Sequence, residues 1–305
     1  MPQLSGVAWV HVTRIGIAES ADAGRTWRYR GTADIELPSA LGGNDPTYWA
    51  PDVFTAPDGT HHMFLTVVPG VFETWEHART IVRLTSDDLL HWRNARPLAL
   101  ASDRVIDACV APLPDGGWRL WYNNERDHKS IYHADSADLQ TWIDRGKSPG
   151  VGERPGEGPY VFEWRGHHWM LVDLWKGLGV YRSDDLTHWT AQPGELLGRP
   201  GLGPDDGVNG GHPGLVVSND RGLSSTSPIR VGPARSPPGI PTRSKPAGVQ
   251  FKLSNFTSVT GYYRAIAISR PRLRSGGPIV RRAAERRRRF AGSIENQPCC
   301  EATPR

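Results

Sequence analysis

The chain has 305 residues, enough to bury a large core either as one all-β domain or as two ordinary domains. Its charge is divided unevenly: residues 1–221 carry 20 Lys and Arg against 29 Asp and Glu, whereas residues 222–305 carry 16 against 3. A specific nucleic-acid partner is therefore not expected, because the basic excess behind the overall net charge of +4 lies only in the last part of the chain.

A short pattern, Ser-x-Asp-Leu-x-x-Trp, recurs along the chain and follows a β-type run each time. In chain order, one looser copy and three strict copies are SADAGRTW at Ser20–Trp27, SDDLLHW at Ser86–Trp92, SADLQTW at Ser136–Trp142 and SDDLTHW at Ser183–Trp189. The Ser and Asp side chains can bond backbone N–H groups of a turn, and the Trp can anchor the strand that follows. Each copy therefore predicts a strand, a turn and a second strand.

A second unit lies between these copies: an acidic residue in a short apolar run, a Gly-containing turn, and then an aromatic-rich strand. Its copies begin at Trp49, Ile106 and Glu157, and each is typical of a β-hairpin. Together the two units give four strands in roughly 50 residues, which is the size of a propeller blade. The sequence thus predicts an all-β fold, a five-bladed β-propeller whose first and last blades are incomplete.

The register of the repeat predicts which residues open the blades and where the propeller ends. The residues expected to open blades two to five at equivalent places, spaced by 55, 50 and 55, are Asp52, Asp107, Glu157 and His212. Blade one lacks an opening strand and begins at about Val7 to Val12, and blade five loses the pattern after Leu215 to Ser218. We therefore predict a propeller domain over residues 1–221 and a disordered basic tail, rich in Pro, Arg and Ser, over residues 222–305.

Three of the blade-opening residues are acids within otherwise apolar strands. The inner strands of a propeller line a central channel, so equivalent side chains are expected to meet in one pocket. Each acid alone could cap a turn or bond the next blade. As a set they favour a functional site, since two carboxyl groups in different environments are what cleavage of a glycosidic bond needs.

The blade-opening motifs resemble those of family 43 glycoside hydrolases, in the same order, over about residues 13 to 220. The motifs that carry the resemblance are YWAPDVF at Tyr48–Phe54, IDACV with Asp107, EGPYVF with Glu157 and GGHP with His212. The resemblance implies an inverting glycosidase in which Glu157 is the general acid and Asp107 orients it. It also implies that His212 lies near a structural calcium ion at the channel axis, through water, with no other cofactor required.

The general base is the main departure from that family. The resemblance places it on the opening strand of blade one, which this chain lacks, and leaves Asp45 and Asp52 as poor substitutes. We therefore expect a glycosidase whose activity is impaired in this chain.

Aromatic side chains near the predicted pocket are candidate platforms for sugar rings, although core packing is the commoner role of such residues. The residues expected to bind the carbohydrate substrate are Asp52, Trp49, Trp121, Asn123, Tyr160, Trp175 and His212. Asn123 belongs to a polar run, WYNNERDHKS, that can line the rim and contact hydroxyl groups.

Two other functions stay open. The copy at Ser20–Trp27 fully matches the Asp-box pattern of the sialidase superfamily, which favours a sialidase-like propeller hydrolase. Such an enzyme needs a cluster of arginines for its substrate's carboxylate, whereas the inner strands here offer acids. The absent base also fits a propeller that binds carbohydrate without cleaving it.

Cysteines and apolar runs indicate the compartment. Cys109 and the adjacent Cys299 and Cys300 fit neither a disulfide framework nor a zinc site, and favour a reducing compartment. No apolar run approaches the roughly 18 residues of a membrane span, and no signal peptide is visible. We expect a cytoplasmic monomer without membrane contact, or a secreted protein if the true start lies upstream.

Overall fold

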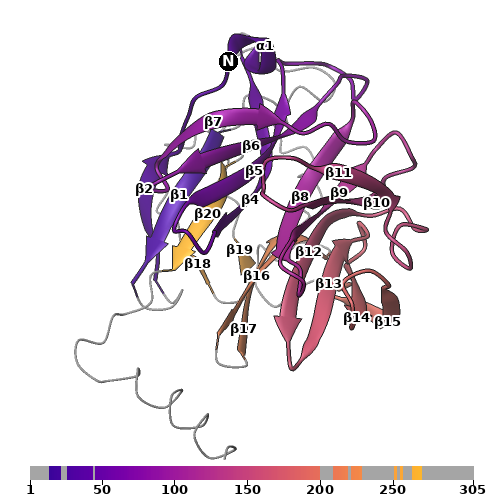
Figure 1. Ribbon diagram of the computed structural model, residues 1–305. Coiled ribbons are helices and arrows are strands. Elements are labelled where there is room, and N and C mark those ends of the chain that lie inside the picture. The colour runs from indigo at the N-terminus through magenta and orange to yellow at the C-terminus, as the bar shows by residue number, and fades with distance from the viewer. Residues whose placement is uncertain are drawn as a thin grey trace, which may run out of the picture. The chain divides into compact units, whose positions relative to one another are not determined.

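The computed structural model describes residues 14–21, 26–43, 45–199, 209–218, 221–228, 251–252, 255–256 and 263–269. The chain divides into units of Met1–Arg270 and Pro271–Arg305, and every described residue belongs to the first. The described elements are strands apart from one short helix, α1 (Ser39–Gly42) (Figure 1). No helix among them has the length and apolar character needed to cross a bilayer.

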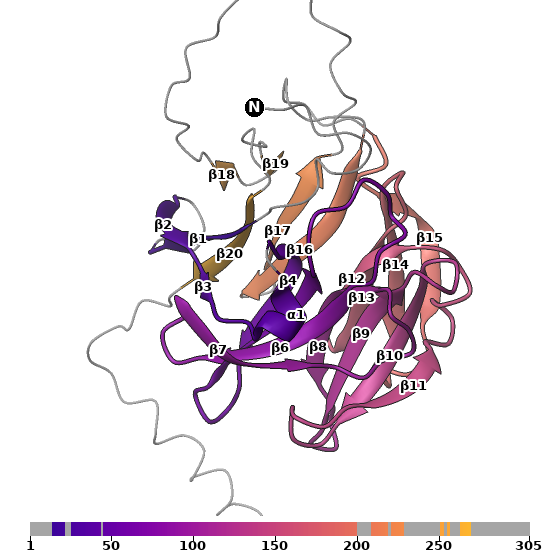
Figure 2. The ribbon, with the colours of Figure 1, turned by 90° about the horizontal axis from the view of Figure 1, so that it is seen from above.

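Blades two, three and four each have four antiparallel strands, and the sheet of blade two has a fifth, short strand at its edge; Figure 2 shows blades three and four side by side. Blade two contains β4 (Thr47–Thr55), β5 (His61–Val68), β6 (Thr80–Ser86) and β7 (His91–Pro97). Blade three contains β8 (Val105–Pro112), β9 (Trp118–Asn124), β10 (Ser130–Ser136) and β11 (Ile143–Lys147). Blade four contains β12 (Glu157–Trp164), β13 (His167–Asp173), β14 (Leu178–Ser183) and β15 (Thr190–Leu196). The first strand of each blade lies against that of the next, so the predicted all-β propeller is confirmed.

Blades one and five are built differently. Blade one contains β1 (Arg14–Ser20) and β2 (Arg28–Thr32), and its third strand is β20 (Tyr263–Ser269), which pairs with β1 in parallel. The short β3 (Asp34–Ile35) joins the edge of blade two by pairing with β7. Blade five pairs β16 (Gly210–Ser218) with β17 (Arg221–Pro228), and β18 (Phe251–Lys252) pairs with β19 (Asn255–Phe256).

Four described strands, β17 to β20, thus lie in the segment that the sequence assigns to the tail, apart from the first residue of β17. β17 completes a hairpin without an aromatic pattern, and β20 pairs with the edge of β1. The predicted entry at Val7 to Val12 and most of residues 229–305 lie outside the described residues. The division at residue 221 therefore stays a prediction.

The repeated Ser-x-Asp-Leu-x-x-Trp motif folds as one kind of turn. In the copy that begins at Ser86, the Ser hydroxyl accepts the N–H of Leu89 (2.9 Å), and Asp88 Oδ1 accepts the N–H groups of Leu90 and His91 (2.8 and 2.9 Å). The Leu of each strict copy has a left-handed backbone, with φ of 66°, 60° and 59° at Leu89, Leu139 and Leu186. This conformation is strained for Leu. The hydrogen bonds that the Ser and Asp oxygens accept from the turn, together with the burial of the Leu side chain, offset the strain.

Replacement of Asp88 by alanine is expected to lower the melting temperature by about 3–6 °C, because Asp88 Oδ1 accepts two backbone N–H groups of the turn, those of Leu90 and His91. Thermal unfolding followed by circular dichroism measures the change. The control is Asp87→Ala, which removes the neighbouring carboxylate and should change the melting temperature by less than about 1 °C. Equal shifts in both variants would contradict the capping role.

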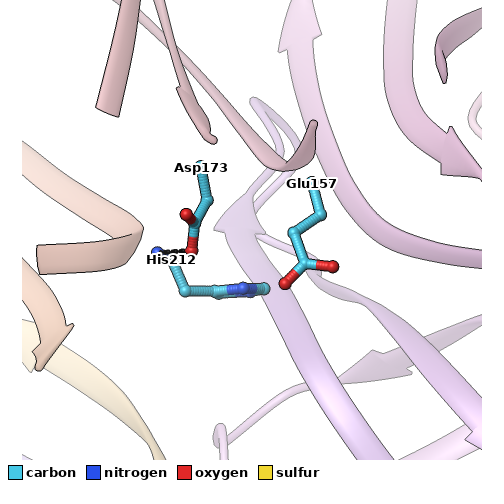
Figure 3. A group of neighbouring side chains, drawn as sticks. All are labelled: Glu157, Asp173 and His212. Atoms are coloured by element: carbon cyan, nitrogen blue, oxygen red, sulfur yellow. Dashed lines mark hydrogen bonds between the residues drawn. The ribbon is translucent and has the colours of Figure 1, made fainter. Parts of the chain in front are cut away.

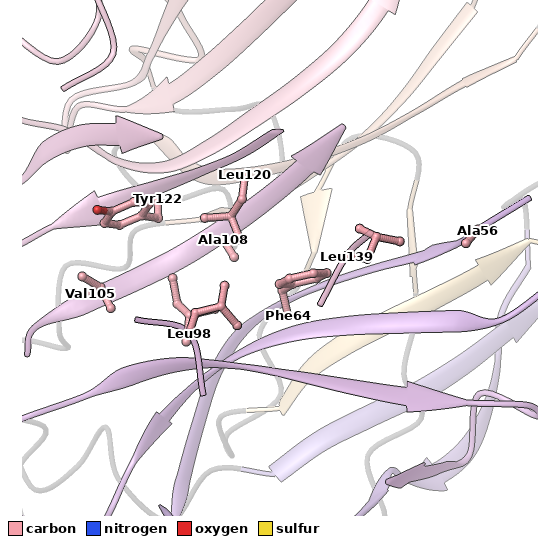
Figure 4. Close-up of a cluster of buried hydrophobic side chains, with 9 residues drawn as sticks. Ala56, Phe64, Leu98, Val105, Ala108, Leu120, Tyr122 and Leu139 are labelled. Atoms are coloured by element: carbon pink, nitrogen blue, oxygen red, sulfur yellow. The ribbon is translucent and has the colours of Figure 1, made fainter. Parts of the chain in front are cut away.

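The apolar core lies between neighbouring blades. One cluster fills the space between blades two and three, around Phe64, Leu120 and Tyr122 (Figure 4). Between blades three and four, Trp121 meets Trp189 edge to face, with ring centroids 5.8 Å apart. Because these clusters fix the angle between adjacent sheets, they also fix how the inner strands converge.

Candidate active site

Each inner strand of blades two to five contains a β-bulge at the same place. The register shifts occur between Trp49 and Asp52, Ile106 and Cys109, Glu157 and Tyr160, and Gly211 and Gly214. The first bulged residue has positive φ in every case: Ala50 (39°), Asp107 (61°), Gly158 (56°) and His212 (49°). A bulge redirects a side chain relative to the regular pleat. These four positions, one per blade, are therefore the true structural equivalents.

This equivalence corrects the register expected from the sequence. Asp107 and His212 occupy the bulge, whereas Glu157 precedes its bulge by one residue and Asp52 follows its own by one. The prediction that all four share one position is thus wrong for Asp52 and Glu157. Spacing between acids cannot reveal on which side of an inserted residue each acid falls.

Asp107 is buried in blade three and contacts blades two, four and five. Its Oδ2 accepts the N–H of Gly158 (3.1 Å), its own N–H donates to Thr66 Oγ1 (3.1 Å), and its Oδ1 lies 3.7 Å from Nε2 of His212. Gly suits position 158, since the residue has a φ of 56° and a Cβ there would crowd Nδ1 of His212 at 3.1 Å. The bulges of blades three, four and five thus meet at one point.

Glu157, Asp173 and His212 form the centre of the site (Figure 3). Glu157 and Asp173 are cross-strand neighbours on β12 and β13, and Figure 3 shows the imidazole of His212 pointing toward the Glu157 carboxylate. Asp173 Oδ2 accepts the N–H of His212 (2.8 Å), and its Oδ1 accepts the N–H of Trp175 (2.8 Å). Burial, with the nearby charges of Glu157 and Asp107, raises the pKa of Asp173 to about 6.

Sequence reasoning missed Asp173. Its signal was an acid at the end of a buried apolar strand, HWMLVD, which hairpin pairing places opposite Glu157. An acid closing such a strand is unusual, because an unpaired carboxylate is costly to bury.

The same three side chains fit a metal ion, since one ligand atom from each lies within 4.8 Å of the others. Two carboxylates suit calcium, whereas a directly bound imidazole suits a transition metal. His212 would therefore reach a calcium ion through water. The calcium ion expected from the sequence stays a prediction.

A chain of charged side chains supports Glu157 from blade three. Lys129 Nζ lies 3.3 Å from Glu157 Oε2 and 2.7 Å from Glu125 Oε1, and Glu125 also pairs with Arg79. The turn that carries Lys129 is strained, with φ of 58° at this residue. Asn123 holds the turn in place: its fully buried amide donates to the carbonyl groups of Lys129 and Gly156. Asn123 is thus a support for the site and is not exposed to a ligand.

Asp52 and Tyr160 lie one step further along their strands, each just after its bulge. Asp52 Oδ2 accepts the N–H of Val110 (2.7 Å), and the Tyr160 hydroxyl donates to the carbonyl of Leu215 (2.6 Å). Burial raises the pKa of Asp52 to about 7, and the carboxylate in turn helps to raise the pKa values of Cys109 and Tyr160. Both side chains join neighbouring blades, in a group separate from Asp107 and Glu157.

The predicted aromatic platforms fall into two classes. Trp121 is fully buried in the core and cannot stack on a sugar, and Trp49 is only 7% exposed, packed against Trp75. Trp175 is 41% exposed, with Lys129 Nζ 5.6 Å from its ring centroid, and is open to a ligand. Aromatic content alone could not separate these cases, because all three follow or begin apolar runs. Trp75, which sequence reasoning did not single out, is also exposed.

No protein-family model and no curated protein matches the sequence. The fold is similar to the crystal structure of a thermostable family-43 glycoside hydrolase, with 17% identity, coverage of 78% of this chain and 96% of that chain, and a TM-score of 0.51. It is also similar to an endo-arabinase from Bacteroides thetaiotaomicron, with 18% identity, coverage of 74% and 92%, and a TM-score of 0.50. At these identities the likeness establishes the fold: the chain shares the propeller architecture of these glycoside hydrolases.

Proposed function

We propose that the chain is a glycoside hydrolase that acts on neutral sugars by an inverting mechanism with two carboxylates, like family 43. The observation that carries this proposal is the convergence of Asp107, Glu157 and His212 from three successive blades. Asp173 adds a further carboxyl group to the same point. Carboxyl groups in unlike environments are what glycosidic cleavage uses.

Glu157 is the proposed general acid. Its side chain is 22% exposed, so a glycosidic oxygen can reach it, and Lys129 fixes one carboxylate oxygen. Asp107 is the proposed positioning residue, since it is buried and binds the N–H of Gly158, directly after Glu157. Each environment suits the assigned role: contact with a ligand for the acid, rigid hydrogen bonding for the residue that orients it.

The general base is the weak part of this site. Asp52 is a poor candidate: it lies in the separate group with Tyr160, the N–H of Val110 occupies one of its oxygens, and a pKa of about 7 leaves much of this carboxyl protonated at neutral pH. We therefore expect slow turnover. If hydrolysis is absent, the same cluster of side chains supports the second candidate, a propeller that binds carbohydrate without cleaving it.

A sialidase-like function fits the site poorly. An anionic sugar requires cations with open coordination. Arg79 and Lys129 belong to the charged network, but Arg79 is 3% exposed and both are paired with Glu125. The arrangement favours an uncharged substrate.

Replacement of Glu157 by Gln should lower the hydrolysis of aryl arabinosides and xylosides with poor leaving groups by about 10²–10⁴-fold, because these need a proton. Dinitrophenyl glycosides, whose leaving group needs none, should be spared. Glu163→Gln, on the exposed far end of the same strand, is the matched control. Equal loss on both kinds of substrate would rule out the acid role.

A further inference from the structure

Two exposed tryptophans lie at the end of the fold that carries Glu157. Trp75 is in the loop between β5 and β6, and Trp175 is in the corresponding loop of blade four, between β13 and β14. Both loops follow the second strand of a blade. The last residue of that strand pairs with the first residue of the inner strand, Val68 with Thr47 and Asp173 with Glu157, so both loops begin at the end of the blade where the inner strand starts. The exposed fractions are 46% for Trp75 and 41% for Trp175.

A buried arginine holds the loop that carries Trp75. Arg79 Nη1 donates to the carbonyl groups of Trp75 (3.0 Å) and His77 (2.8 Å), and the same guanidinium pairs with Glu125. The indole of Trp75 also packs against that of Trp49, with ring centroids 6.3 Å apart. Burying a guanidinium is costly, so a buried ion pair such as that of Arg79 with Glu125 adds little net stability to the fold. Arg79 thus holds the backbone at Trp75, and the contact with Trp49 positions the indole.

The same charges connect Trp75 with Glu157. Glu125 binds both Arg79 and Lys129, and Lys129 contacts Glu157 and faces the ring of Trp175. Direct contacts therefore run from the loop of Trp75, through blade three, to the proposed acid. Of the side chains along this path, Lys129 is 39% exposed, whereas Arg79 and Glu125 are largely buried and paired with each other.

We propose that Trp75 forms a second sugar-binding subsite, adjoining the subsite at Glu157 and Trp175, and that the ligand is a neutral oligosaccharide of at least two sugars. The identity of the ligand rests on the proposed function. The C–H face of a sugar ring packs on an indole, and a platform already fixed by its neighbours loses little freedom on binding. Pairing of the intervening charges favours hydroxyl groups over an anionic substituent.

Calorimetric titration with arabino- and xylo-oligosaccharides of one to four sugars tests the subsite. In the wild-type chain, the affinity should rise at least about tenfold from the monosaccharide to the trisaccharide of the recognised series. Trp75→Ala should abolish this rise and leave the monosaccharide affinity unchanged, and Trp75→Phe should restore part of it. Trp164→Ala is the control, because Trp164 is the last residue of β12 and so lies at the opposite end of blade four from Glu157.

Equal affinity for all chain lengths, or a rise that survives in Trp75→Ala, overturns the subsite while the hydrolase proposal stands. Binding that requires Trp75, combined with turnover that Glu157→Gln leaves unchanged, supports the subsite and overturns the hydrolase proposal. Absence of binding to every saccharide overturns both. Melting curves of each variant confirm that the substitution leaves the fold intact.

Discussion

Replacement of Trp92 by alanine is expected to lower the free energy of unfolding by about 3–5 kcal/mol, the range found when a large aromatic side chain is deleted from a core. Trp92 is fully buried, and its indole N–H donates to the carbonyl of Leu89 (3.2 Å). It packs in the cluster that joins blades one and two, whose other buried members are Ile15, Tyr48, Met63, Leu65, Val67, Val82 and Leu84. The substitution removes both the apolar contacts and the anchor of one repeated turn.

Urea unfolding measures this loss, and Trp75→Ala serves as the matched control. Trp75 is the same residue type at an exposed place, so its removal should change the free energy of unfolding by less than about 1 kcal/mol. A comparable loss in both variants would mean that Trp75 is part of the core, which would also remove the basis of the proposed second subsite.

The second large effect is a fall in stability as the pH rises, caused by Asp52. Burial raises the pKa of this carboxyl to about 7 in the folded chain, above the ordinary value of about 3.9 in the unfolded chain. The folded state therefore binds more protons than the unfolded state between about pH 4 and pH 7, and its stability declines across that window. Each unit of difference between the folded and unfolded pKa corresponds to about 1.4 kcal/mol, so the free energy of unfolding should fall by about 2–4 kcal/mol once the partial exposure of Asp52 is taken into account.

The difference in unfolding free energy between the wild type and Asp52→Asn, measured from pH 4 to pH 8, isolates this contribution. Asn cannot ionise, so the unfolding free energy of the variant should rise relative to that of the wild type as the pH rises. Asp58→Asn, on the same hairpin, is the control: the N–H of Thr60 lowers the pKa of Asp58, whose contribution to stability is lost only as the pH falls below about 4, so its difference from the wild type should stay constant from pH 4 to pH 8. A difference that stays constant with pH would show that Asp52 is ionised throughout.

The parts of the fold that the sequence predicts well are those fixed by local chemistry. The turns at Ser86, Ser136 and Ser183 carry their own hydrogen-bond partners, so their motif identifies them without tertiary information. The opening of each blade is likewise visible, because a polar residue interrupts an apolar strand. These local signals were enough for the all-β propeller.

The features that sequence analysis missed depend on partners distant in the chain. β20 pairs with β1 across more than two hundred residues, and backbone pairing of this kind leaves no side-chain pattern. Asp173 becomes part of the site only through its register with Glu157 and its bond to His212. The burial of Trp121 and the exposure of Trp75 depend on which face of a blade meets its neighbour.

At the four bulges, the side chain near the axis differs from blade to blade while the strand pairing of the blades stays the same. In each of these inner strands, backbone pairing continues on both sides of the bulge. The second bulged position is Pro51, Ala108, Pro159 or Pro213. Proline has no N–H, so in three of the four blades the strand donates no hydrogen bond at this position. Ala, Asp, Gly and His occupy the first position in turn. In blades two, three and five this position thus holds Ala, Asp and His while the sheets keep the same construction, so the side chain at the bulge can change the chemistry of the axis without changing the blade; in blade four, Gly158 leaves room for His212.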